Sequence, residues 1–332
     1  MTNILCCDWG TSSFRLRLVD PSDFKVLAEL QKTEGVAETF RTWQKDTSKV
    51  RFDFYGSKLR SAIDEMAKSV NTGLTQVPVI VSGMASSSIG MEEVPYASLP
   101  FKANGSQASV RIVKDFNGAG MPLVLVSGVK SDDDVMRGEE AQLIGLFNLP
   151  ETSELEKNNS IFVFPGTHSK HIHVVNNSIT GFQTFMTGEV FNILSEHSIL
   201  KDSIKVNSGS VLMEPLNISA FSSGVEKSGF ANLLSALFTV RTNQLFSKFD
   251  KEQNAFYLSG LLIGSELQQL SKDPAKMLII CSGKHLYEHY KLAAEVLDLN
   301  ENVIFIQPEL IDKATIAGQV QLFKMSNTIA ND

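Results

Sequence analysis

The feature that most constrains the fold of this chain is a short motif that occurs twice, nearly half a chain length apart. Gly10-Thr11-Ser12-Ser13 matches Gly166-Thr167-His168-Ser169 as Gly-Thr-x-Ser, at an offset of 156 residues in a chain of 332. A short apolar run precedes each motif, and residues that alternate between apolar and polar follow it, as in a strand with one solvated face. The repeat therefore predicts two strand–turn–strand hairpins in two related α/β domains, by duplication rather than as a solenoid.

The rest of the chain also predicts strands followed by helices, which is typical of an α/β protein with a largely buried sheet. Apolar runs predict strands at 77–81, 122–126, 277–281 and 303–306, and helical spacing predicts helices at 57–70, 135–147, 255–270, 285–297 and 314–325. The polar segment 151–160 is typical of a connection. We expect an N-terminal domain at 1–155, a C-terminal domain at 156–312, and a closing helix at about 313–332 that can return to the first domain.

Composition and charge exclude several classes of protein. The chain has 30 Lys+Arg against 37 Asp+Glu, a net charge of −7, which disfavours sequence-blind binding to nucleic acid or anionic lipid. No apolar run approaches the length of a membrane span, and the N-terminus lacks the pattern of a signal peptide. The three cysteines, of which Cys6 and Cys7 are adjacent, provide no disulfide framework and no metal spacing. We expect a cytoplasmic protein without nucleic-acid or membrane partners, and the sequence leaves a homo-oligomer open.

The two hairpin tips have the composition of phosphate sites. Glycine lets the backbone approach an anion closely, and successive N–H groups and hydroxyls form a concave cradle for it. Asp8 ends the strand before the first tip, where a carboxylate can hold Mg²⁺ through water against phosphates. Either tip alone could be an ordinary turn, and Asp8 could simply cap it. Neither a Walker pattern nor a G-x-G-x-x-G that opens a helix is present.

A second informative segment runs from Val135 to Gly145 and contains two adjacent carboxylates. On a helix, Glu140 would lie on an apolar face with Met136 and Leu143, and Glu139 would be offset by about 100°. Burial would raise the pKa of Glu140, which suits a general base, whereas a solvated helix pair is the alternative. Arg137 could bind a carboxylate or phosphate, or form a surface salt bridge.

These segments together resemble one family, the 2-dehydro-3-deoxygalactonokinases of the sugar kinase/actin/heat-shock ATPase superfamily. The resemblance rests on the segments 8–13, 82–84, 135–140, 165–170, 187–189 and 258–264, which occur in the same order over nearly the whole chain. It implies two ribonuclease-H-like (actin-like ATPase) domains with a nucleotide in the cleft between them. It also implies ATP- and Mg²⁺-dependent phosphorylation of 2-dehydro-3-deoxy-D-galactonate, a small sugar acid, at its 6-hydroxyl.

The resemblance also assigns roles to residues. It makes Asp8 with Gly10, Thr11, Ser12 and Ser13 the first phosphate motif, and Gly166, Thr167, His168, Ser169 and Lys170 the second. Ser282 and Gly283 resemble an adenosine motif, and the loop with Ser82, Gly83, Met84 and Ser87 is expected, with Arg137, near the substrate. Similarity to exopolyphosphatases favours Glu140 as the base, with Glu139 in reserve. Phe164 and Pro165 stand where many superfamily members carry an aspartate, so the metal would depend more on Asp8.

Two other functions use the same features. A polyphosphatase-type phosphohydrolase would place water where the sugar hydroxyl is expected, and a non-catalytic ATP-binding switch would close on nucleotide without any acceptor. The sequence does not distinguish galactonate from gluconate derivatives.

Overall fold

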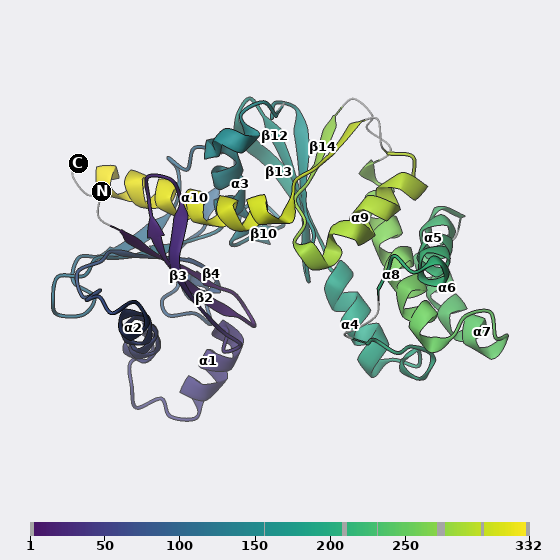
Figure 1. The fold of residues 1–332 in the computed structure, drawn as a ribbon, viewed down its shortest axis with the longest axis horizontal. Coiled ribbons are helices and arrows are strands. Elements are labelled where there is room, and N and C mark those ends of the chain that lie inside the picture. The colour runs from purple at the N-terminus through teal and green to yellow at the C-terminus, as the bar shows by residue number, and fades with distance from the viewer. Residues whose placement is uncertain are drawn as a thin grey trace. The chain divides into compact units, whose positions relative to one another are not determined.

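The computed structural model describes residues 3–155, 157–207, 211–230, 232–270, 276–299 and 302–329. It divides into two compact units (Figure 1): unit 1 is made of 1–155, 175–181 and 311–332, and unit 2 of 156–174 and 182–310. Position 156, where the C-terminal domain was expected to begin, and positions 330–332 of the expected closing helix lie outside the described residues. Among the described residues, no helix combines the length and the apolar character needed to cross a bilayer.

Unit 1 is built on a six-stranded mixed sheet. Its strands lie in the order β3-β2-β1-β4-β8-β7, in which β1 is antiparallel to β2 and parallel to β4. The strands are β1 (Ile4–Trp9), β2 (Phe14–Asp20), β3 (Lys25–Lys32), β4 (Val79–Gly83), β7 (Val110–Val113) and β8 (Leu123–Val126). The parallel pairing continues from β4 to β8, so β1, β4 and β8 all end at the same edge of the sheet.

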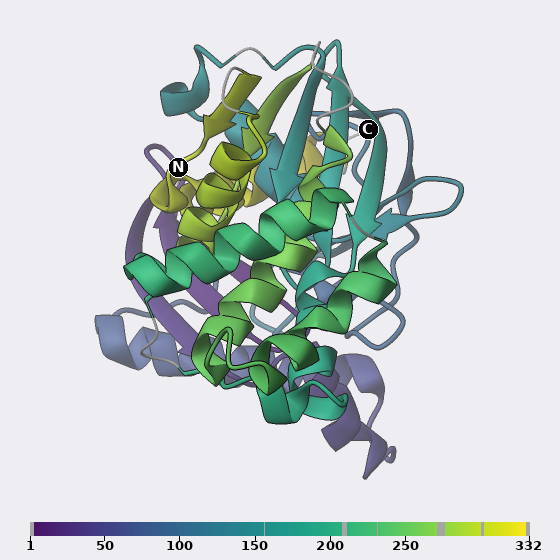
Figure 2. The ribbon, with the colours of Figure 1, turned by 90° about the vertical axis from the view of Figure 1, so that its right-hand side faces the viewer.

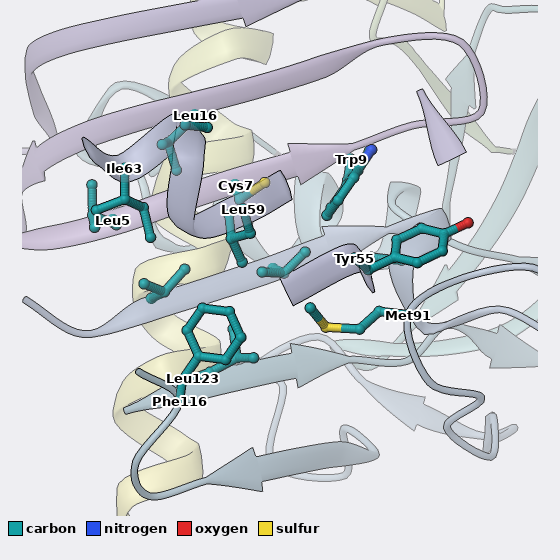
Figure 3. Packing of buried hydrophobic residues seen from close by; sticks show 14 of the residues in the cluster. Leu5, Cys7, Trp9, Leu16, Tyr55, Leu59, Ile63, Met91, Phe116 and Leu123 are labelled. Carbon is teal, nitrogen blue, oxygen red and sulfur yellow. The ribbon is translucent and has the colours of Figure 1, made fainter. Parts of the chain in front are cut away.

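The core of unit 1 lies between this sheet and helix α2 (Arg51–Val70). The helix buries an apolar stripe that includes Tyr55, Leu59 and Ile63, and Figure 3 shows these side chains against Leu5 and Trp9 of β1. The remaining helical elements of the unit are α1 (Val36–Gln44), α3 (Glu139–Asn148) and α10 (Pro308–Ile329), with short 3-10 turns at η1 (Met84–Ser86) and η2 (Pro150–Thr152).

A small sheet and one further strand complete unit 1. The small sheet has the order β10-β9-β5, from β10 (Val135–Met136), β9 (Val129–Lys130) and β5 (Ala97–Ser98). Strand β6 (Phe101–Lys102) pairs with Ser178 and Ile179, which belong to the 175–181 part of unit 1.

Unit 2 repeats the topology of unit 1. The strands of its sheet are β11 (Ser160–Phe164), β12 (Ser169–Val175), β13 (Ser178–Phe185), β14 (Met277–Ile280) and β15 (Val303–Phe305), in the order β15-β14-β11-β12-β13, with β6 next to β13. The end of β12 and the start of β13 fall in the 175–181 part of unit 1. Strand β11 is antiparallel to β12 and parallel to β14, as β1 is to β2 and β4. The predicted α/β class and the repeat of a strand–turn–strand hairpin in both units are therefore confirmed.

The helices of unit 2 include two long ones, α5 (Pro215–Phe230) and α8 (Lys251–Leu267), which are seen in green in Figure 2. Three glycines let these helices approach closely: a Cβ on Gly224 would lie 2.2 Å from the Tyr257 carbonyl oxygen, one on Gly260 would lie 2.1 Å from that of Phe221, and one on Gly264 would lie 2.5 Å from Ser228 Oγ. The other helices are α4 (Thr187–His197), α6 (Leu233–Leu237), α7 (Thr239–Leu245) and α9 (Lys284–Val296), with a 3-10 turn at η3 (Lys201–Ser203).

The predicted helix at 135–147 includes residues that the structure places in a strand. We expected a helix at 135–147, but Val135 and Met136 pair with β9 as strand β10, and α3 begins only at Glu139. Gly138 separates the two with a φ of 115°, a backbone conformation that side-chain-bearing residues rarely adopt. Met136 is therefore not on the same helix as Glu140, because strand pairing prevails over the helical spacing there.

Helix α10 returns to unit 1 and packs closely on α3. A Cβ on Gly318 of α10 would lie 1.8 Å from the Ala141 carbonyl oxygen, and one on Gly145 of α3 would lie 1.7 Å from that of Ala314. In addition, Gln319 Nε2 donates to the Cys7 carbonyl and to Ser82 Oγ, both at 2.8 Å, which links α10 to the ends of β1 and β4.

We predict that Gly318→Ala destabilises the protein by about 1–3 kcal/mol, the usual cost of overpacking a core. The sign is informative, because alanine has the higher helix propensity and would otherwise stabilise a helix by about 1 kcal/mol. Urea unfolding followed by circular dichroism measures the change. Gly73→Ala is the matched control, since a Cβ there meets nothing within 4 Å. Equal unfolding midpoints for the two variants would contradict the close α3–α10 contact.

Candidate active site

The carboxyl ends of β1 and β4 bring the predicted residues of unit 1 together. Their register places Asp8 beside Ser82 and Trp9 beside Gly83. A Cβ on Gly83 would lie 3.3 Å from Asp8 Oδ1, and one on Gly138 would lie 4.0 Å from the Gly83 Cα. Three segments far apart in sequence, ending at Asp8, Gly83 and Gly138, therefore form one cluster, which we call the strand-end cluster.

Glu140 is the buried carboxyl group of this cluster, with 2% of its surface exposed. Its Oε2 accepts a hydrogen bond of 2.7 Å from the Gly138 amide, and its Oε1 is buried without a partner. Burial and the neighbouring Glu139 raise the pKa of Glu140 to about 8, as expected for a desolvated acid. The group is thus placed to exchange a proton near neutral pH.

Asp8 and Glu139 are more accessible. Asp8 is half-buried, and burial raises its pKa, against the opposing effect of Arg15 and Arg17 on the neighbouring strand. Glu139 is also half-buried, and its Oε2 accepts a hydrogen bond of 3.1 Å from the Arg137 amide.

The loop after β4 is more buried than expected. The hydroxyls of Ser82 and Ser87 face the protein: Ser82 Oγ accepts from Gln319, and Ser87 Oγ donates to the Met84 carbonyl at 2.7 Å. Met84 is half-buried. Of the expected substrate residues here, Ser82 therefore contacts α10 from the end of β4, and only Ser87 hydrogen-bonds within the loop.

In each unit, the hairpin tip contacts the N-terminus of the helix that follows the third strand of the sheet, α1 after β3 and α4 after β13. In unit 1, Val36 N donates to the Gly10 carbonyl at 2.9 Å and Ala37 N to the Thr11 carbonyl at 3.0 Å. In unit 2, Glu189 N donates to the Thr167 carbonyl at 3.1 Å. The tip carbonyls are thereby occupied, whereas the amides of Thr11 and Thr167 have no backbone acceptor in the described part of the chain. Amides and the positive ends of α1 and α4 both favour an anion at these tips.

Two glycines allow this close contact, and neither of them was assigned a role from the sequence. A Cβ on Gly35 would lie 2.4 Å from the Thr11 carbonyl oxygen, and one on Gly188 would lie 2.7 Å from that of Gly166. Both glycines lie directly before or at the start of α1 and α4. The occurrence of a glycine at the start of the helix after each hairpin is the sequence feature that could have predicted this contact.

The second tip is one residue shorter than the first. Trp9 pairs with Phe14 across four tip residues, 10–13, whereas the register that pairs Phe164 with Lys170 leaves only 166–168 as the tip. Thr11, Ser12, Ser13, Thr167 and His168 are exposed, and Gly10 and Gly166 are half-buried. Ser169 and Lys170, which we expected at the tip, lie instead in β12 and are buried. The expected phosphate contact of the Ser169 hydroxyl is wrong for this conformation, because that hydroxyl donates to Glu266.

Glu266 of α8 organises the interior behind the second tip. Its buried carboxylate accepts from Ser169 Oγ at 2.6 Å, from Tyr290 OH at 2.9 Å and from Thr187 Oγ1, and it lies 3.0 Å from His171 Nε2. These four residues belong to β12, α9, α4 and again β12, so one carboxylate ties three elements to α8. No local pattern in the sequence predicts this network, because its partners lie far apart in the chain.

A cavity of about 610 Å³ opens beside the second tip, entirely within unit 2. Its walls are mainly apolar residues of α4, α8 and α9, and they include Gly166, Thr167, Thr187, Gly188, Phe191, Phe256, Ser259, Leu262, Ile263, His285, Leu286, His289 and Tyr290. Its size suits a drug-sized or nucleotide-sized ligand. Ser282 and Gly283 are not part of its wall but directly precede α9.

Two histidines of unit 2 have different environments. Burial lowers the pKa of His289 to about 4, and its ring stacks on Phe256 at 6.1 Å between centroids, so a neutral, flat group faces the cavity. His168 is exposed at the tip, where its Nε2 contacts the Glu189 carboxylate.

We predict that Tyr290→Phe lowers the free energy of unfolding by about 1.5–3 kcal/mol, because it removes a buried hydrogen bond to a charged group. Tyr287→Phe is the control, since Tyr287 OH only accepts a bond of 3.2 Å from Gln307 in an exposed position. Urea unfolding of the two variants measures the difference. A loss of the same small size in both would mean that the Glu266 network contributes nothing measurable to stability.

Comparisons with known proteins agree with these features. The family model of 2-keto-3-deoxy-galactonokinase matches residues 8–322. The chain is 30% identical over 264 residues to the probable 2-dehydro-3-deoxygalactonokinase DgoK1 of Rhizobium meliloti (strain 1021), which covers 78% of each protein. It is 31% identical over 231 residues to the 2-dehydro-3-deoxygalactonokinase of Escherichia coli (strain K12), which covers 67% of this chain and 72% of that one.

A solved structure is also similar over the full length. A Sinorhizobium meliloti protein described as a candidate 2-dehydro-3-deoxygalactonokinase superposes with a TM-score of 0.75 and 27% identity, over 98% of this chain and 99% of that one. The resemblance read from the motifs is confirmed, and the chain belongs to the 2-keto-3-deoxy-galactonokinase family of sugar-acid kinases.

Proposed function

We propose that this protein transfers the γ-phosphoryl group of ATP to the 6-hydroxyl of 2-dehydro-3-deoxy-D-galactonate. The observation that carries the proposal is Glu140, a buried acid with an unpartnered Oε1 and a pKa of about 8, in the strand-end cluster. Its family and its named relatives support the substrate class.

The nucleotide is assigned to unit 2. The cavity of about 610 Å³ offers an apolar space with His289 as a flat, neutral wall for the base. The same cavity is lined by Gly166, Thr167 and Gly188, where tip amides and the N-terminus of α4 favour phosphate oxygens. We also assign the first tip, 10–13, to phosphate binding, because its composition matches that of the second tip and because it contacts the N-terminus of α1 in the same way.

Asp8 suits a hydrated Mg²⁺ that accompanies the phosphates. No group of three or more His, Cys, Asp or Glu side chains that could hold a metal occurs among the described residues. Mg²⁺ in phosphoryl-transfer sites needs only one or two carboxylates, because waters and phosphates complete its shell. When bound, the ion would neutralise phosphate charge.

Glu140 then acts as the general base. Its ionised form accepts the proton of the sugar acid's primary hydroxyl, whose oxygen attacks the γ-phosphorus in line while the bond to the β-phosphate oxygen breaks. Glu139 is the alternative base. We further propose that units 1 and 2 are the two actin-like domains of the family, that unit 1 binds the acceptor and that unit 2 binds the nucleotide.

An ADP-release assay tests the function. The protein is incubated with Mg·ATP and either 2-dehydro-3-deoxy-D-galactonate, its gluconate epimer, or no acceptor. We expect turnover with the galactonate derivative alone. Release of ADP without acceptor would indicate a hydrolase, and bound ATP without any turnover would indicate a switch.

We predict that Glu140→Gln lowers kcat by about 10²–10⁴-fold, the usual contribution of a general base, and leaves the Kd of ATP unchanged. Glu139→Gln is the matched control with the same change of charge one residue away. Steady-state kinetics and calorimetry measure both quantities. A larger loss in Glu139→Gln than in Glu140→Gln would move the role of base to Glu139.

The pKa of Glu140 also predicts how activity depends on pH. A base must be ionised to act, so kcat/KM for the sugar acid should rise with pH through about 8, the pKa of Glu140. Rates measured from about pH 6 to pH 10 test this. A profile that is flat over that range would exclude Glu140 as the titrating base.

The same pKa makes a separate prediction for stability. The Glu140 pKa of about 8 in the folded protein exceeds the ordinary value of 4.5, so the folded state holds the proton more tightly. This contribution to stability is complete below about pH 4.5 and is lost as the pH rises through about 8. Glu140→Gln stays neutral, so its unfolding free energy relative to wild type should increase over that window. A constant difference between the two proteins would contradict the raised pKa.

A further inference from the structure

Arg137 is a half-buried cation whose charge lowers the pKa of Glu140, although the two groups are not close enough to form an ion pair. It forms no ion pair with any described residue, although the arginines at 15, 17 and 111 each face a carboxylate. Its Nε is buried and has no hydrogen-bond partner. A guanidinium withdrawn from water is costly unless an anion compensates for the lost hydration.

One end of the guanidinium group is already held by the protein. Nη1 donates to the Ser86 carbonyl at 2.9 Å, to Ser86 Oγ, and to Ser127 Oγ at 3.3 Å. The group also lies over the ring of Tyr96, with Cζ 4.3 Å from the ring centroid. The edge formed by Nε and Nη2 has no acceptor among the described residues, and such an edge binds a carboxylate with two parallel hydrogen bonds.

The small sheet β10-β9-β5 builds this arrangement. Ala97 and Met136 both pair with Val129, so Tyr96, Gly128 and Arg137, each one position further, form a row across the three strands. Gly128 in the middle has no side chain, and a Cβ there would lie 2.0 Å from the Met136 carbonyl oxygen and 3.1 Å from the Arg137 Cα. The glycine therefore lets Arg137 and Tyr96 meet on one face of the sheet.

We propose that Arg137, stacked on Tyr96, binds the C1 carboxylate of the acceptor and selects sugar acids over neutral sugars. The proposal rests on the proposed function, which places the acceptor in unit 1. Arg137 and Glu140 lie on either side of the Gly138 turn, and in this assignment they serve the two ends of the six-carbon acid. The carboxylate would form the ion pair that Arg137 lacks among the described residues.

A chemical double-mutant cycle tests the proposal. Its two acceptors are 2-dehydro-3-deoxy-D-galactonate and the analogue in which hydroxymethyl replaces the C1 carboxylate, which keeps the same C6 hydroxyl. Wild type should prefer the acid by about 100-fold or more in kcat/KM, on the strength of a bidentate charged contact. Arg137→Met should reduce this preference to a few-fold through the KM of the acid, with the neutral analogue and the Kd of ATP nearly unaffected.

Two further variants separate recognition from folding. Tyr96→Leu removes the platform without changing charge and should reduce the acid preference in part. Arg60→Met is the matched control, because Arg60 also lies over an aromatic ring, Phe116, at 5.0 Å, and should leave the preference unchanged. An equal loss of kcat/KM for both acceptors in Arg137→Met would overturn the proposal, because a contact with the phosphoryl group or a folding defect would give that result. A preference for the acid that is as large as in the wild type would also overturn it.

Equilibrium binding distinguishes failure of the recognition site from failure of the proposed function. Calorimetry measures how the acid and the neutral analogue bind to the wild type and to Arg137→Met without turnover. Binding of the acid that depends on Arg137, without phosphorylation of either acceptor, would uphold the site and overturn the kinase substrate. Phosphorylation of the acid, together with binding that does not depend on Arg137, would uphold the kinase substrate and overturn the recognition site. If the acid is not phosphorylated and its binding does not depend on Arg137, both proposals are overturned.

Discussion

The parallel pairing of β1 with β4 is the interaction on which the strand-end cluster depends. Its register places Asp8 beside Ser82 and Trp9 beside Gly83, so that polar residues about 75 positions apart leave the sheet at one edge. In unit 2, β11 pairs with β14 in the same sense and its hairpin tip emerges at the corresponding edge. Because parallel strands end at the same edge of a sheet, the topology alone brings the residues that follow them close together, whatever their side chains are.

Desolvation of charged groups is the second physical constraint, and the buried charged groups differ in how far the protein supplies them with hydrogen-bond partners. Glu266 is surrounded by hydroxyl donors and a histidine, and so stabilises unit 2 from within. Glu140 has one amide donor and an orphan oxygen, and its pKa rises instead. In the part of the chain that the structure describes, the side chain of Arg137 hydrogen-bonds and stacks on neutral groups only, and it acts on Glu140 through its charge without forming an ion pair. A satisfied charge is structural, whereas an unsatisfied one is where a ligand can contribute.

Much of this arrangement could be read from the chain before its structure was known. The first tip at 10–13 and the repeated hairpin were predicted, and the second tip was predicted at 166–170, of which 166–168 form the tip. A buried Glu140 was one of the two alternatives that the sequence left open, and the structure buries it. The start of α3 and the place of Ser169 were not predicted. Both depend on strand register: β10 takes two residues from the expected helix, and a hairpin shorter by one residue turns Ser169 inward.

The sequence by itself determined the α/β class, the repeated hairpin, the family and the identity of the chemical groups, because hydrophobic periodicity and turn residues act over a few neighbouring positions. Only the tertiary structure decided which groups meet. The row of Tyr96, Gly128 and Arg137, and the convergence of Ser169, Thr187 and Tyr290 on Glu266, join segments tens of residues apart. Such contacts follow from strand register and helix packing, which long-range burial sets and no local pattern encodes.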